Sequence, residues 1–334
     1  MPTTSSYNNG EITQRARIAD ATFAGRVGGN QEFIASPDNI SLLERQPDAA
    51  PLRSLTASFN LDNFADGDIW RMALLEGLGS MLLIFLLGGP AIGLTTLDQS
   101  LFAKTLYASL TSWFALSIFT FCLGPVSGGH INPSITLATF FAGLCTFPRA
   151  VLYIAAQSIG AIIAAFLLKL GVGGDNYFEA GLIPGCTVDT TMVSVGQMFT
   201  LEFMFGLTAI FMAFGVGLDP RQGKIYGPAF GPVLVGITLG LVTLCSAIIR
   251  PGYTGASLNP ARCLGLMTAK YELENHWVHW VAQLAATSLN GMLYHTAPPW
   301  RKEDPLLSQV ANYLSRYIHL HKRRNERQAP LHHE

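Results

Sequence analysis

The amino-acid sequence predicts an all-α membrane protein, and its charge distribution is the first reason. Charged side chains make up 13% of the 334 residues and hydrophobic ones 49%, whereas soluble domains are roughly 25% charged. Residues 1–68 carry 14 of the 43 charges and residues 300–334 carry 11, so the 231 residues between them have 18. We therefore expect a membrane-embedded domain at residues 69–298 between two polar tails, 1–68 and 299–334, of which the first is largely disordered.

Long apolar stretches are the second reason. About 20 apolar residues in a helix cross a bilayer core, and six stretches meet this length: 69–94, 102–123, 150–168, 195–218, 225–249 and 276–297. Two further apolar segments, 132–141 and 259–268, are too short to cross alone. These short segments predict half-helices that enter the bilayer and stop within it.

The third reason is an internal repeat. Three kinds of polar residue recur at an offset of 126 or 127 positions: Glu76 and Glu202, Gln157 and Gln283, and Asn132-Pro133 and Asn259-Pro260. The repeats span about residues 69–170 and 195–298, and each contains three long apolar stretches. Because three is odd, the second repeat must be inverted in the membrane relative to the first.

Charges in the predicted loops give the orientation. Lys and Arg of short loops stay on the cytoplasmic side, and the alternate loops here contain Arg149, Arg221 with Lys224, and Arg301 with Lys302. The loop before residue 195 instead contains acidic residues, namely Asp175, Glu179 and Asp189. Both chain termini are therefore expected in the cytoplasm.

The Asn-Pro pairs begin the two half-helices. Asn is a favoured N-cap, and Pro at the first helical position leaves no N–H unsatisfied. Inverted half-helices bring two partially positive N-termini together near the midplane, where they repel cations. The amides of Asn132 and Asn259 can donate hydrogen bonds to a passing water, which would interrupt a proton-conducting chain of waters. The pattern predicts a pore for uncharged molecules.

The boxes Asn132-Pro133-Ser134 and Asn259-Pro260-Ala261, the Ser-Gly-Gly-His sequence at 127–130 and the following Arg262 resemble the major intrinsic protein (aquaporin) family. Ser134 departs from the usual Ala. The sequence from Asn259 to Cys263, with cysteine directly after the arginine, is similar to that of the X-intrinsic proteins of fungi and plants. The resemblance implies a right-handed bundle of six transmembrane helices plus two half-helices, assembled as a homotetramer.

Five polar residues are expected to support the pore loops rather than perform chemistry. By the resemblance, Glu76 and Glu202 accept hydrogen bonds from loop N–H groups, since a carboxylate inside a bilayer requires partners. Gln157 and Gln283 are expected to bridge helices, with pore contact as the alternative. His130 is expected to hold its loop.

The resemblance also implies a selectivity filter of four residues at the outer mouth. Three are Arg262, Ala256 and Ala247, and the fourth is Ser112 or Phe114, of which one can face the pore because a helix turns about 200° over two residues. A water-selective member of the family has His at the position of Ala247. Alanine at both 247 and 256 predicts a filter ring that is wider and less polar than the ring of a water-selective member.

We therefore expect a passive channel for glycerol, urea and hydrogen peroxide with water, in a lipid bilayer. The plasma membrane is favoured over an internal one. A water-selective aquaporin and a non-conducting adhesion or scaffold protein are the alternatives. No enzyme, cofactor or metal site is expected, and the net charge of −1 disfavours a nucleic-acid partner. Five cysteines without CxxC spacing predict no disulfide framework.

Overall fold

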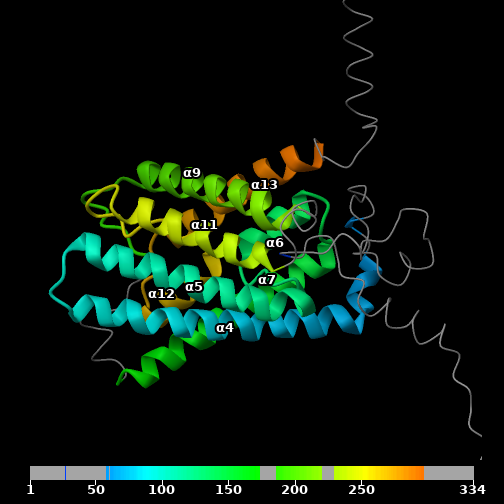
Figure 1. Ribbon diagram of the computed structural model, residues 1–334, viewed down its shortest axis with the longest axis horizontal. Helices are drawn as coiled ribbons and strands as arrows, with labels where there is room; N and C mark the ends of the chain where they lie inside the picture. Colours follow the sequence, from blue (N-terminus) through cyan, green and yellow to red (C-terminus); the bar gives the residue numbers. More distant parts are fainter. Residues whose placement is uncertain (1–26, 28–57, 60, 174–185, 220–228, 297–334) are drawn as a thin grey trace, which may run out of the picture.

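A computed structural model describes residues 27, 58–59, 61–173, 186–219 and 229–296 of the chain. Six long helices run along one bundle (Figure 1): α4 (Gly67–Thr96), α5 (Leu101–Ser127), α7 (Phe147–Gly171), α9 (Val195–Ala213) with its π-helical end η4 (Phe214–Leu218), α11 (Phe230–Ala247) and α13 (His276–Thr296). A 3-10 turn, η3 (Leu61–Ala65), precedes α4.

Five of these helices, counting α9 with η4, are long and apolar enough to cross a membrane, and α13 is the sixth long helix. The predicted all-α bundle with two half-helices is confirmed. The predicted C-terminal tail and most of the N-terminal tail lie outside the described residues. So do six of the orientation charges, namely Asp175, Glu179, Arg221, Lys224, Arg301 and Lys302.

The two half-helices are α6 (Pro133–Phe141) and α12 (Pro260–Lys270). With 9 and 11 residues, they are about 14 and 17 Å long at 1.5 Å per residue, roughly half of a bilayer core. Helix α6 lies toward the end of the bundle where α4 begins, and α12 lies toward the opposite end (Figure 1). Their N-termini therefore face each other inside the bundle.

Each half-helix packs against the third long helix of the other repeat, so α12 contacts α7 and α6 contacts α13. Glycines permit this close approach. A Cβ atom on Gly265 would lie 2.3 Å from the Ala161 carbonyl oxygen, and one on Gly291 would lie 2.8 Å from the Ala138 carbonyl oxygen. The two repeats are thus interlocked, and neither could close its half of the bundle alone.

Within the first repeat, α4 and α7 cross with their backbones in contact. A Cβ atom on Gly160 would lie 2.1 Å from the Gly77 carbonyl oxygen. Since real Cβ atoms do not approach backbone so closely, any side chain at position 160 would force the two helices apart. This crossing also places Glu76, the residue before Gly77 on α4, beside α7.

We expect Gly160→Ala to destabilise the folded protein by about 1–3 kcal/mol, the usual cost of overpacking a tight site. The matched control is Gly89→Ala in α4, where an added Cβ would meet nothing within 4 Å. There, Ala should be neutral or stabilising by up to about 1 kcal/mol through helix propensity. Thermal unfolding in detergent measures both. Equal melting temperatures for the two variants would contradict the close crossing.

Candidate functional site

The caps of the two half-helices contact each other across the middle of the bundle. The amide nitrogen Nδ2 of Asn132 donates to the Leu258 carbonyl oxygen at 2.9 Å, and Nδ2 of Asn259 donates to the Ile131 carbonyl oxygen at 3.2 Å. The Oδ1 atoms of the same side chains accept from Ser134 N at 2.8 Å and Arg262 N at 3.2 Å. Each amide nitrogen has two hydrogens, and the contact across the junction uses one of them.

The residue before each capping asparagine has a left-handed backbone. Ile131 has a φ of 39° and Leu258 a φ of 53°, a conformation that costs a non-glycine residue of order 1–3 kcal/mol and persists only where its surroundings impose it. These two residues provide the carbonyls that accept from the opposite asparagines. The unusual backbone is therefore part of the junction.

Glu76 of α4 holds the loop that leads into α6. Its fully buried carboxylate accepts from the backbone N–H groups of His130, at 3.0 Å, and Ile131. It also accepts from the Ser127 hydroxyl at 2.6 Å and from Gln157 Nε2 at 3.0 Å. The carboxylate thus provides hydrogen-bond acceptors for buried non-helical backbone.

Glu202 of α9 makes the matching contacts in the second repeat. Its buried carboxylate accepts from the Ser257 backbone N–H at 3.0 Å, from the Ser257 hydroxyl, and from the Tyr253 hydroxyl at 3.0 Å. Gln283 Nε2 lies 3.2 Å from the Glu202 carbonyl oxygen and 3.4 Å from Oε2. Inverted symmetry therefore extends from the helices to the side chains that hold the loops.

Three other polar residues brace the first loop. His130 Nδ1 lies 3.1 Å from Thr136 Oγ1, and the ring packs edge-on against Tyr153. The Tyr153 hydroxyl donates to the Ser127 carbonyl at 2.6 Å and accepts from Arg149 at 2.9 Å. Arg149, one of the predicted cytoplasmic loop charges, is thus buried at the start of α7. Sequence reasoning missed Tyr153, in an apolar stretch, and Tyr253, in the loop before α12, because the residues around a tyrosine in the sequence give no sign of its hydrogen-bond partner.

Three residues of the predicted filter lie in α12, in the loop before it or beside that loop. Arg262 is partly buried, and its guanidinium donates to the Ser257 carbonyl at 3.1 Å. Ala247 ends α11, and a Cβ atom on Gly255 would lie 3.3 Å from it. The Ala256 N–H donates to the neighbouring Ser246 hydroxyl at 3.0 Å. The loop that contains Ala256 is therefore joined to the end of α11.

On α5, the two alternatives for the fourth position differ in exposure. Phe114 is 56% exposed and stacks on Trp113, whereas Ser112 is half-buried.

A cavity of about 50 Å³ lies on the α6 side of the junction. It is lined by side chains from both repeats and by one residue of the N-terminal segment, including Thr120, His130, Asn132, Thr238, Leu258 and Val27. Val27 is 3% exposed, and its N–H donates to the Gly128 carbonyl at 3.0 Å. A residue from far outside the predicted membrane domain thus forms part of this wall.

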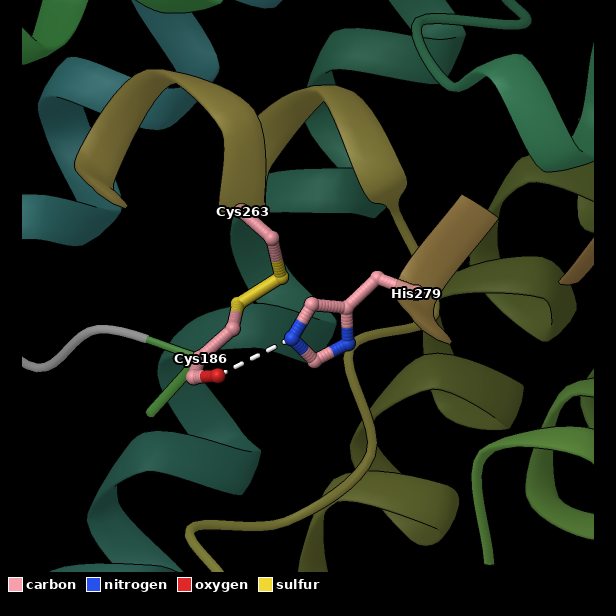
Figure 2. Close-up of side chains that lie close together, drawn as sticks. All are labelled: Cys186, Cys263 and His279. Carbon is pink, nitrogen blue, oxygen red and sulfur yellow. Dashed lines mark hydrogen bonds between the residues drawn. A yellow bond between two sulfur atoms is a disulfide. The ribbon is translucent and has the colours of Figure 1, made fainter. Parts of the chain in front are cut away.

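The expectation of no disulfide framework is wrong for one pair of cysteines. Cys186 and Cys263 form a disulfide across 77 residues of sequence, with Cα atoms 5.4 Å apart (Figure 2). The two cysteines are far apart in the sequence and no CxxC spacing links them, so only the fold brings them together. Cys122 and Cys245 are exposed and unpaired.

Residues 63–294 match the family model described as Major intrinsic protein. Aquaporin TIP1-1 of Arabidopsis thaliana is 28% identical over 249 residues, which cover 73% of this chain and 93% of that protein. Aquaporin-4 of Bos taurus is 28% identical over 227 residues, covering 67% and 66%. Among solved structures, the aquaglyceroporin from Plasmodium falciparum aligns with a TM-score of 0.55 and 22% identity, over 69% of this chain and 96% of that one.

We expect Glu76→Gln to destabilise the protein by at least about 2 kcal/mol, since hydrogen bonds to a charged group contribute about 1.5–3 kcal/mol each. The glutamine NH2 group would also face the loop N–H groups, which are donors themselves. Glu274→Gln, at an exposed position, is the control and should be neutral. Melting temperatures in detergent compare the two. A Glu76→Gln variant as stable as the Glu274→Gln control would show that the carboxylate does not hold the loop.

Proposed function

The chain belongs to the major intrinsic protein family, whose members are membrane channels and not enzymes, and we propose that it passes glycerol, urea and hydrogen peroxide together with water. The observation that carries this proposal is the junction, where each capping asparagine donates to the loop carbonyl before the other cap. The similar proteins are named as aquaporins and as an aquaglyceroporin, and these names support both water and glycerol as permeants.

The same junction is proposed to exclude ions and protons. Two helix N-termini, each equivalent to roughly half a positive charge, face each other there and oppose a cation. The second hydrogen of each asparagine amide is proposed to donate to a passing water. A water that accepts from both asparagines has its lone pairs occupied, and it cannot accept a proton from its neighbour in the file.

The proposed filter consists of Arg262, Ala256, Ala247 and Ser112. The exposure of Phe114 and its stacking on Trp113 support Ser112 as the pore-facing member of the pair. Three small side chains leave room for a solute larger than water, and the guanidinium offers donors to its hydroxyl or carbonyl oxygens. This combination favours small polar solutes over water alone.

The same proposal includes an arrangement in the membrane. Both termini are placed in the cytoplasm, and the protein is placed in the plasma membrane as a homotetramer with one pore in each subunit. Large apolar side chains exposed along α4 and α5, such as Leu74 and Phe102, suit contact with lipid or with a neighbouring subunit. Membership of the X-intrinsic subgroup stays a prediction.

A water-selective pore is the second candidate, and swelling assays on vesicles separate it from the first. We expect the reconstituted protein to pass water, glycerol and urea faster than empty vesicles do. Ala247→His should lower glycerol and urea permeability several-fold while water still passes, because imidazole narrows the ring. Fast water flux with glycerol and urea fluxes equal to those of empty vesicles would overturn the wide filter. Absence of all flux would favour a scaffold protein.

A further inference from the structure

We propose that Cys186 and Cys263 are specificity-determining residues, because their disulfide fixes the turn of α12 from which Arg262 reaches the pore. This inference rests on the proposed role of Arg262 in the filter. Both cysteines are buried, at 4% and 0% exposure, and the bond is the covalent link between α12 and the segment before α9 (Figure 2).

Arg262 and Cys263 are consecutive residues in the first turn of α12, so their side chains leave the helix about 100° apart. The cysteine side chain points toward Cys186 and His279 (Figure 2), while the arginine guanidinium reaches back to the Ser257 carbonyl at 3.1 Å. The disulfide therefore holds one side of the turn while the arginine projects from another. A shift of the turn away from Cys186 would move the guanidinium with it.

The Cys186 side of the bond is itself firmly held. His279 Nε2 donates to the Cys186 carbonyl at 2.9 Å. The backbones of Thr187 and Asp189, one and three residues further along, bond to the loop before α12. Thr254 Oγ1 donates to the Thr187 carbonyl at 3.0 Å, and Asp189 N donates to the Gly252 carbonyl at 2.9 Å. The disulfide thus attaches α12 to a fixed segment, as a positioning device requires.

His279 also connects this anchor to the buried carboxylate of the second repeat. Its Nδ1 lies 3.5 Å from Glu202 Oε1, and Glu202 holds the Ser257 N–H. Ligand-type atoms of Cys186, Cys263 and His279 lie within 4.8 Å of one another, a spacing that would also suit a metal ion. However, the two sulfur atoms are bonded to each other, which favours a covalent clamp over a metal centre.

Reduction offers a direct way to open the clamp in the folded protein. A water-soluble phosphine transfers two electrons to the S–S bond, which breaks and takes up two protons to give two thiols. The phosphine is oxidised to its oxide with an oxygen atom from water. The disulfide lies at the α12 end of the bundle, which the predicted orientation places outside the cytoplasm, where disulfides persist.

The test compares three variants of the full chain in vesicles: Cys186→Ser, Cys263→Ser and the control Cys245→Ser, an exposed cysteine on α11. The measured quantity is the ratio of urea or glycerol permeability to water permeability. We expect the ratio to rise at least about two-fold in either clamp variant, since filter diameter and donor placement set selectivity. Phosphine treatment of the unmodified protein should reproduce the rise, and Cys245→Ser should leave the ratio unchanged.

Two further measurements distinguish a failure of the disulfide proposal from a failure of the proposed function. Alkylation followed by mass spectrometry should find Cys186 and Cys263 protected until the phosphine is added, and immediate labelling of both would overturn the proposal. Amide hydrogen exchange of residues 255–263 should accelerate on reduction, whether or not the pore conducts. If a serine variant does not fold, the permeability ratio of the phosphine-treated protein tests the proposal instead. An unchanged ratio in a folded, conducting and fully reduced channel would refute the clamp while leaving the proposed function intact.

Discussion

Backbone that leaves a helix inside a bilayer must find hydrogen-bond partners within the protein, because lipid offers none. In this chain two buried carboxylates meet that requirement. Glu76 accepts from two N–H groups of the loop before α6, and Glu202 accepts from the Ser257 N–H of the loop before α12. With the N–H groups satisfied, the loop carbonyls are left to turn toward the junction. The left-handed residues Ile131 and Leu258 are tolerated because these anchors hold the loops on either side.

The tight helix crossings follow from the same requirement. A carboxylate reaches a loop only if the helix that bears it lies close to the loop, and Gly77 lets α7 approach α4 immediately beside Glu76. Gly265 and Gly291 in turn bring each half-helix against the opposite repeat. The precision of the junction therefore depends on backbone contacts between helices as much as on polar side chains.

Much of this architecture could be predicted from sequence because its causes are local or periodic. Apolar length gives the six helices, Asn-Pro pairs mark the starts of α6 and α12, and repetition at a fixed offset implies inversion. Contacts that depend on folding in three dimensions could not be predicted. The partner of Cys263 lies 77 residues away, Tyr153 bonds to a loop carbonyl of another element, and Arg149 is buried although a loop position suggests exposure. The alternatives Ser112 and Phe114 likewise differ only in rotation about a helix, which the sequence alone does not fix.

The position of Val27 means that the cavity beside the junction is not enclosed by the transmembrane bundle alone. Its N–H donates to the Gly128 carbonyl, and its side chain packs against η4 and α11. Part of the wall of this cavity therefore comes from a residue that the apolar pattern assigns to a tail. Replacing Val27 would change that wall even with every residue of the membrane-spanning helices retained.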